Sequence, residues 1–309
     1  MERVTALLLA AILLGGCAKI PVQQAGNSSG KKVTAAPVIG TYDGKTITMK
    51  VRLQTDVAID VSKTAPFSQG LTAVCAICEG KDQFVYMNED GEILNDAIYA
   101  FAYPFQSDGR ALVNTTGDSW FYIDTNGQKV ADGQAPAVEE LPFYEADGRI
   151  GLKDKNGNPL TDAKFSFVSG LLDEANYAVL AEGEHQNVLI DRQGKVLVTL
   201  PDDCAGARSM GDRIVCAYRG DADKRQFRLL DDAGTLLNDR YFTAIGDFEE
   251  GLAPVAADGK LGLIDRTGAI VIEPSLPVDD AGGLCSGLSE DRIVSSLDGR
   301  LLIIEVIRH

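Results

Sequence analysis

Short runs of alternating apolar and polar residues recur along the chain, with tight turns between them. The clearest example lies at 260–274, where KLGLID and AIVIEP flank Thr267 and Gly268. Alternation with a period of two places successive side chains on opposite faces of a strand, so each run predicts a strand with one buried face. We therefore expect this stretch to form two strands joined by a tight turn.

Seven segments share the pattern of the first of these two runs. They are Phe84–Asn88, Trp120–Asp124, Ile150–Asp154, Asn187–Asp191, Phe227–Asp231, Leu261–Asp265 and Leu301–Glu305. In six of them a glycine follows three residues after the acid or amide, and these glycines recur every 30 to 40 residues. A recurrence of this length predicts a repeat architecture.

The acid-x-x-Gly ending has a physical explanation as a turn. We expect the acid or amide to accept a hydrogen bond from the backbone N–H two residues on, and the glycine to supply a positive φ. The predicted turn-forming residues are Asp124, Gly127, Asp154, Gly157, Asp191, Gly194, Asp231, Gly234, Asp265 and Gly268. The alternative is that one of these carboxylates is catalytic or binds a metal.

Residues 248–274, which read FEEGLAPVAADGKLGLIDRTGAIVIEP, resemble the WG repeat of bacterial proteins. Leu261 stands where the repeat has its tryptophan. Trp120 keeps the tryptophan but is followed by Phe121 in place of glycine, whereas Gly151 keeps the glycine after Ile150. The resemblance extends over residues 67–305 and is closest in the 248–274 unit.

A unit of three or four strands cannot bury both of its faces alone, so neighbouring units must share a core. The sequence thus predicts an all-β fold, a β-propeller of about seven small three- to four-stranded blades. An open β-solenoid of stacked hairpin units is the alternative. The repeat domain spans 38–309, with repeats from 67. Residues 38–66 supply extra strands that either join the last unit and close a ring, or cap an open stack.

The N-terminal residues 1–16 read as a lipoprotein signal peptide. The apolar run from Val4 to Leu14 is too short to span a bilayer, which needs about 20 residues. Leu14-Gly15-Gly16-Cys17 resembles the lipobox of bacterial lipoproteins, which implies lipidation of Cys17 and attachment to a membrane. Residues 17–37 are expected to be a flexible tether. The resemblance implies a location in the cell envelope, facing the periplasm or exposed on the surface. Because Ala18 rather than Asp follows the cysteine, the lipobox resemblance favours attachment to the outer membrane in a Gram-negative cell.

Composition narrows the possible partners. The net charge is −16 and the longest basic run is Lys31-Lys32, so we expect no nucleic-acid partner. Only two histidines are present, His185 and His309, and we expect no metal and no other cofactor. The local concentration of aromatic residues at 99–105 and 120–122 is either core or a binding surface.

Six cysteines remain to be assigned, of which Cys17 is the expected lipid site. Cys204 and Cys216 are a possible disulfide, whereas Cys75 and Cys78 are more simply two small residues of a strand. The sequence therefore predicts a non-catalytic scaffold that binds a protein or an envelope polymer. The alternative is an exported enzyme that uses the thiols Cys75 and Cys78 or the carboxylates at strand ends.

Overall fold

The computed structural model describes residues 35–115, 119–136, 142–171, 176–180, 187–209, 213–219, 225–279 and 284–309. These residues form strands and two short 3-10 helices, η1 (Val61–Lys63) and η2 (Leu94–Asp96), and no α-helix occurs among them. Within this described part of the chain, no helix has the length and apolar character needed to cross a bilayer.

The strands form seven separate sheets, numbered here in chain order. Sheet 1 contains β3 (Leu71–Cys78) and β4 (Lys81–Asn88). Sheet 2 contains β5 (Phe101–Ala102), β6 (Arg110–Asn114), β7 (Trp120–Asp124) and β8 (Lys129–Asp132). Sheet 3 contains β9 (Phe143–Ala146) and β10 (Arg149–Leu152). Sheet 4 contains β11 (Phe167–Leu171), β12 (Asn176–Leu180), β13 (Asn187–Asp191) and β14 (Val196–Thr199).

Sheet 5 contains β15 (Cys204–Ser209), β16 (Arg213–Arg219) and β17 (Arg225–Asp231). Sheet 6 contains β18 (Ala244–Ile245), β19 (Leu252–Ala257), β20 (Lys260–Asp265) and β21 (Ile270–Pro277). Sheet 7 combines both ends of the described chain: β1 (Val38–Tyr42), β2 (Lys45–Ala58), β22 (Leu284–Ser289), β23 (Arg292–Leu297) and β24 (Arg300–Arg308).

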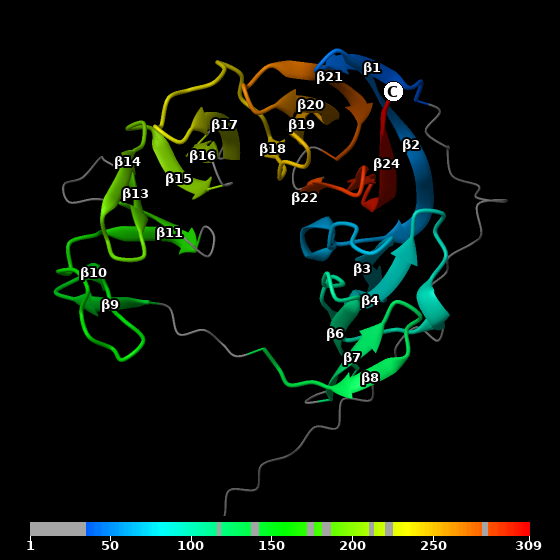
Figure 1. Ribbon diagram of the computed structural model, residues 1–309, viewed down its shortest axis with the longest axis horizontal. Coiled ribbons are helices and arrows are strands. Elements are labelled where there is room, and N and C mark those ends of the chain that lie inside the picture. Colours follow the sequence, from blue (N-terminus) through cyan, green and yellow to red (C-terminus); the bar gives the residue numbers. More distant parts are fainter. Residues whose placement is uncertain are drawn as a thin grey trace, which may run out of the picture.

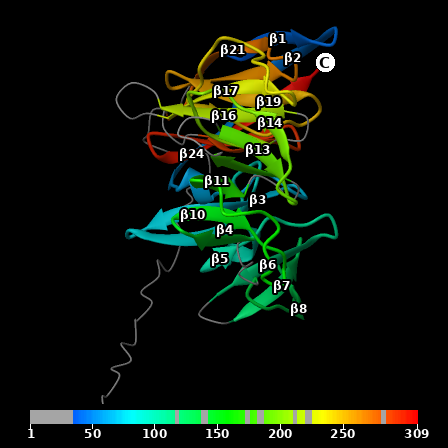
Figure 2. The same ribbon diagram turned by 90° about the vertical axis from the view of Figure 1, so that its left-hand side faces the viewer.

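The seven sheets are set around a common centre in chain order (Figure 1). Consecutive sheets stand side by side except between β8 and β9, where Figure 1 shows a wide break in the ring. The view from the side shows the sheets of the left half of the ring edge on, one above the next (Figure 2). Each of the seven repeated segments falls in a different sheet, so the predicted all-β, propeller-like fold of about seven units is confirmed.

Sheet 7 joins the beginning of the described chain to its end. β2 runs antiparallel to β24, with Ile47 opposite Arg308 and Gln54 opposite Leu302, and β1 pairs with β2 on the outside. The side chains of Ile47 and Met49 are fully buried in the core beside sheet 6. Of the two roles that the sequence leaves open for this segment, the structure shows strands added to the last unit.

The core lies between consecutive sheets rather than at the centre of the ring. In six of the seven repeats, all but that of sheet 2, the residue two positions before the turn residue packs toward the next sheet. In all repeats but that of sheet 3, the residue one position before the turn residue packs toward the preceding sheet. The six resulting pairs, each within one apolar cluster, are Tyr86 with Ile123, Leu152 with Ile190, Leu189 with Leu230, Leu229 with Ile264, Leu263 with Ile304, and Ile303 with Met87. Among the described residues no such cluster joins sheet 2 to sheet 3.

Candidate binding surface

The structure places the ten predicted turn residues in five turns of one design. The Oδ1 atoms of Asp124, Asp154, Asp191, Asp231 and Asp265 each accept hydrogen bonds from two backbone N–H groups, two and four residues on, at 2.7–3.1 Å. The five glycines have φ between +75° and +85°. Each glycine N–H donates to the carbonyl oxygen of its aspartate at 2.8–3.1 Å. These carboxylates therefore hold turns, which leaves them poorly suited to acid–base chemistry.

Asn88 forms the same turn in sheet 1, because its Oδ1 accepts from the N–H groups of Asp90 and Glu92 at 3.1 and 2.9 Å. At the equivalent turn of sheet 3, the side-chain amide of Asn158 also donates to Asp154, at 3.0 Å. This side-chain hydrogen bond, followed by the backbone ones, lowers the pKa of Asp154 from its ordinary value of 3.8.

Cys75 and Cys78 lie on β3 and are both buried. Burial is the main cause that raises the pKa of the Cys75 thiol to about 11, so little reactive thiolate forms at neutral pH. Cys75 packs in the core between sheets 1 and 2. Cys78 is disulfide-bonded, whereas Cys75 is a thiol, so the two do not form a dithiol redox pair with one another.

The predicted disulfide between Cys204 and Cys216 is wrong. Cys204 is buried and carries no disulfide, and its Sγ lies 3.0 Å from the carbonyl oxygen of Gly206. The pairing of β15 with β16 explains why, since it places Tyr218 opposite Cys204 and Ala207 opposite Cys216. The spacing of the two cysteines suggested neighbouring strands correctly, but the register between the strands decides which side chains meet. Cys17, the predicted lipid site, lies outside the described residues, as do the signal peptide and most of the tether.

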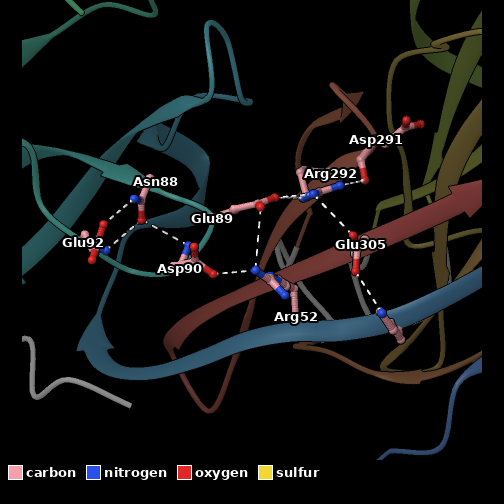
Figure 3. Close-up of polar contacts among 9 residues, drawn as sticks. Arg52, Asn88, Glu89, Asp90, Glu92, Asp291, Arg292 and Glu305 are labelled. Atoms are coloured by element: carbon pink, nitrogen blue, oxygen red, sulfur yellow. Dashed lines mark hydrogen bonds and ion pairs between the residues drawn. The ribbon is translucent and has the colours of Figure 1, made fainter. Parts of the chain in front are cut away.

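A network of charged side chains connects sheet 1 to sheet 7 and was not anticipated from the sequence (Figure 3). Arg292 of β23 bonds Glu89, in the turn after β4, through its Nε at 2.7 Å, and its Nη2 lies 3.3 Å from Glu305 of β24. Arg52 of β2 reaches the same turn, with Nη2 2.5 Å from Asp90. The Arg292 side chain is only 15% exposed, so this contact is partly shielded from water. The residues of this network are far apart in sequence, and no local motif predicts that they meet.

An exposed aromatic cluster lies on sheet 2. Phe101 is 40% exposed and Tyr103 36% exposed, and Trp120 is partly exposed beside them. The ring centroids are 4.9 Å apart for Phe101 and Tyr103, 6.1 Å for Phe101 and Trp120, and 6.2 Å for Tyr103 and Trp120. The register carries Phe101, Asn114 and Trp120 across three adjacent strands. Of the two roles that the sequence left open for these aromatic residues, Tyr99 and Phe105 are core and the cluster is surface.

No group of three or more His, Cys, Asp or Glu side chains suited to hold a metal ion occurs in the described part of the chain. The described residues thus form a framework of repeated β sheets with an exposed aromatic cluster on sheet 2. This arrangement defines the class of the protein as a β-repeat protein.

The repeat family follows from the sequence match. The family model of the WG containing repeat matches residues 86–117 and 231–260. The predicted WG repeat is confirmed at these two places. The second match covers the first half of the 248–274 unit and ends before Leu261. No curated protein matches the chain significantly.

Solved structures of low sequence identity resemble the chain over most of its length. They include BamB from Moraxella catarrhalis, with a TM-score of 0.36 at 14% identity, covering 86% of this chain and 93% of that one. The WD40 domain of coronin from Toxoplasma gondii has a TM-score of 0.46 at 11% identity, covering 88% and 89%. The Dos1 propeller has a TM-score of 0.39 at 13% identity, covering 81% and 78%.

Proposed function

We propose that this chain is a non-catalytic, lipid-anchored protein of the cell envelope whose ring of β sheets is a scaffold that binds a protein or an envelope polymer. The observation that carries the proposal is the exposed aromatic cluster of Phe101, Tyr103 and Trp120 on a framework of repeats. Exposed Trp and Tyr side chains supply large contact areas at low entropic cost, and they are enriched at binding hot spots.

The thiols and carboxylates that an enzyme could use have structural roles in the described residues. Cys75 is buried with a raised pKa, Cys78 is engaged in a disulfide, and the five turn aspartates are occupied by backbone N–H groups. The alternative of a thiol or carboxylate enzyme therefore lacks a supporting observation among the described residues.

The membrane anchor in this proposal is the lipidated Cys17. It rests on the Leu14-Gly15-Gly16-Cys17 motif directly after an apolar segment. Two or more acyl chains anchor a protein stably, whereas a single chain gives marginal binding. In a Gram-negative cell the proposal favours the outer membrane, with the domain facing the periplasm or the cell surface.

The experiment that tests both parts is a pull-down from membranes with three forms of the chain. Wild type should incorporate radiolabelled palmitate and capture a discrete partner. The Cys17→Ala variant should not be labelled and should no longer be found in the membrane fraction. Phe101→Ser/Tyr103→Ser should keep the label but lose the partner. If Cys17→Ala fractionates identically with wild type, the anchor is wrong, and if the aromatic variant captures the same partner, the aromatic cluster is not the binding surface.

A further inference from the structure

The segment that carries the exposed aromatic cluster has few backbone hydrogen bonds within its own sheet. It enters sheet 2 as β5, which is only two residues long and pairs with β6. Tyr103 lies beyond this strand, and its N–H donates to the carbonyl oxygen of Leu112 at 3.0 Å. A segment with so few ladder bonds opens easily. Contacts from outside sheet 2 therefore decide how firmly the exposed rings are held.

Strand β4 of sheet 1 contacts this segment at alternate residues. Phe84 and Tyr99 exchange two backbone hydrogen bonds, at 2.9 and 2.8 Å. The Phe84 ring packs on the Phe101 ring, with centroids 5.0 Å apart. The Tyr86 hydroxyl donates to the carbonyl oxygen of Tyr103 at 2.6 Å. Sheet 1 therefore bonds the backbone of Tyr103 directly, through a side chain of its core.

Tyr86 is a core residue, 1% exposed, in the apolar cluster between sheets 1 and 2. Its ring centroid lies 5.7 Å from that of Tyr99 and 4.8 Å from that of Phe105. Burial, followed by the neighbouring Tyr99, raises the pKa of Tyr86 above its ordinary value of 10.0. The hydroxyl thus keeps its proton at physiological pH and acts as a donor to the Tyr103 carbonyl.

Packing between the repeats does not require a tyrosine at this position. Tyr86 stands two positions before the turn residue, and five of the other six sheets have an aliphatic residue there. These five are Leu152, Leu189, Leu229, Leu263 and Ile303. An aliphatic side chain is therefore sufficient to build the core between sheets, and the hydroxyl of Tyr86 is an addition to it.

The junction between sheets 5 and 6 shows the same contact without an aromatic cluster. Residues 94–105 (LNDAIYAFAYPF) and 237–248 (LNDRYFTAIGDF) align without a gap. The backbone is alike, since the N–H of Gly246 donates to the neighbouring strand as that of Tyr103 does. Three residues differ in kind: Tyr86 is replaced by Leu229, Phe101 by Ala244 and Tyr103 by Gly246. The tyrosine hydroxyl and the exposed rings thus occur together at one junction and are both absent from the other.

We propose that Tyr86 is a positioning residue of the aromatic cluster, because its hydroxyl fixes the backbone of Tyr103 and thereby the arrangement of the exposed rings. Tyr86 is buried and acts on a partner only through Tyr103. Aromatic side chains that are ordered before binding lose less conformational freedom when the partner arrives. The inference rests on the proposed function, since it concerns the same surface, and it adds a residue of the core to the determinants of affinity.

Trp120 reports on the order of the cluster, because it is the one tryptophan of the sequence and its ring centroid lies 6.2 Å from that of Tyr103. In the Tyr86→Phe variant, acrylamide should quench the Trp120 fluorescence more strongly than in wild type. The emission should also move to longer wavelength, because a loosened Tyr103 leaves Trp120 more open to water. A variant with wild-type quenching and emission would overturn the positioning role.

Tyr144→Phe is the matched control for loss of a hydroxyl. The Tyr144 hydroxyl also donates to a carbonyl oxygen 17 residues later, that of Thr161, and also at 2.6 Å. Thermal unfolding checks that both variants are folded at the temperature of the assay. Tyr144→Phe should leave the emission and quenching of Trp120 unchanged. Equal changes in the two variants would reveal a general loosening of the fold, which would also overturn the positioning role.

Titration of the partner captured in the membrane pull-down separates this inference from the proposed function. Tyr86→Phe should weaken binding by about two- to tenfold, the effect of one neutral hydrogen bond, and Tyr144→Phe should bind as wild type does. If Phe101→Ser/Tyr103→Ser loses the partner but Tyr86→Phe binds with wild-type affinity, the binding surface stands and the positioning role is wrong. If Tyr86→Phe opens Trp120 to acrylamide but Phe101→Ser/Tyr103→Ser still captures the partner, the ordering of the rings by Tyr86 holds and the proposed binding surface is wrong.

Discussion

At the scale of single residues, the turns are the feature that the sequence predicts best. Asp or Asn and Gly at a fixed spacing define both the hydrogen-bond acceptor and the positive φ, and both are local properties of the chain. The aspartate Oδ1 also accepts a second hydrogen bond, from the backbone N–H four residues on. This bond was not predicted, because it depends on how the chain turns back into the next strand.

Asp154 should make stability depend on pH. Its pKa is lowered in the folded state, chiefly by the Asn158 side chain. Its stabilising contribution is therefore fully present above the ordinary value of 3.8 and is lost as pH falls through the lowered folded value. We expect Asp154→Asn to lower the urea midpoint at pH 7 and to differ progressively less from wild type as the pH falls below 3.8. A difference that stays constant or grows on acidification would contradict this.

Gly268 should be among the least replaceable turn glycines. Its φ is +85°, and an added Cβ would approach Leu237 at 2.7 Å. Gly44 has a similar φ of +72° but open space around it. We expect Gly44→Ala to cost about 1–2 kcal/mol from backbone strain alone, and Gly268→Ala to cost clearly more. Thermal unfolding of both variants measures the difference, and equal losses would show that the contact with Leu237 relaxes at no cost.

At the scale of elements, strands and hairpins were predictable and contacts between sheets were not. The alternating pattern places each strand of the 260–274 hairpin correctly, because it reflects one buried face. The Arg292–Glu89 contact joins residues 203 positions apart, and no periodicity connects them. The Cys204–Cys216 prediction failed for a related reason, since register is fixed by the whole sheet rather than by spacing.

Arg292 should stabilise the contact between sheet 1 and sheet 7. We expect Arg292→Met to destabilise the fold by about 1–3 kcal/mol. The substitution removes a positive charge from beside two carboxylates, Glu89 and Glu305, that are partly shielded from water. Lys129→Met provides the matched control, since its ion pair with Asp132 is largely exposed and should contribute less than about 1 kcal/mol. Denaturant unfolding of the two variants compares them directly, and equal effects would show that the network is no more than a surface pair.

At the scale of the whole molecule, the sequence predicted the number of units but not how the two ends of the chain meet. Seven copies of one segment can be counted in the sequence. Whether residues 38–66 join the last unit or cap a stack depends on the pairing of β2 with β24, which the sequence does not show.

Removal of β1 and β2 should therefore damage the far end of the chain. We expect deletion of residues 35–58 to expose the β24 edge, including Ile304 and Val306, which are at most 1% exposed in the intact protein. The truncated chain should aggregate or lose cooperative unfolding, and a synthetic β2 peptide added in trans should restore solubility. A truncated chain that unfolds cooperatively at the wild-type temperature would show that β2 is dispensable.

The composition of sheet 7 also sets an order of events during synthesis. β2 is made among the first of the described strands and β24 after all the others, so the sheet cannot form until β24 has been synthesised. Until then, Ile47 and Met49 lack the part of their cover that β24 supplies, and β2 has an open edge of the kind that pairs with other chains. A contact between the two ends of a chain also slows folding, because its loop must close first. We therefore expect the β2 edge to stay open to non-specific pairing for longer than the edges of a repeat protein that folds from one end to the other.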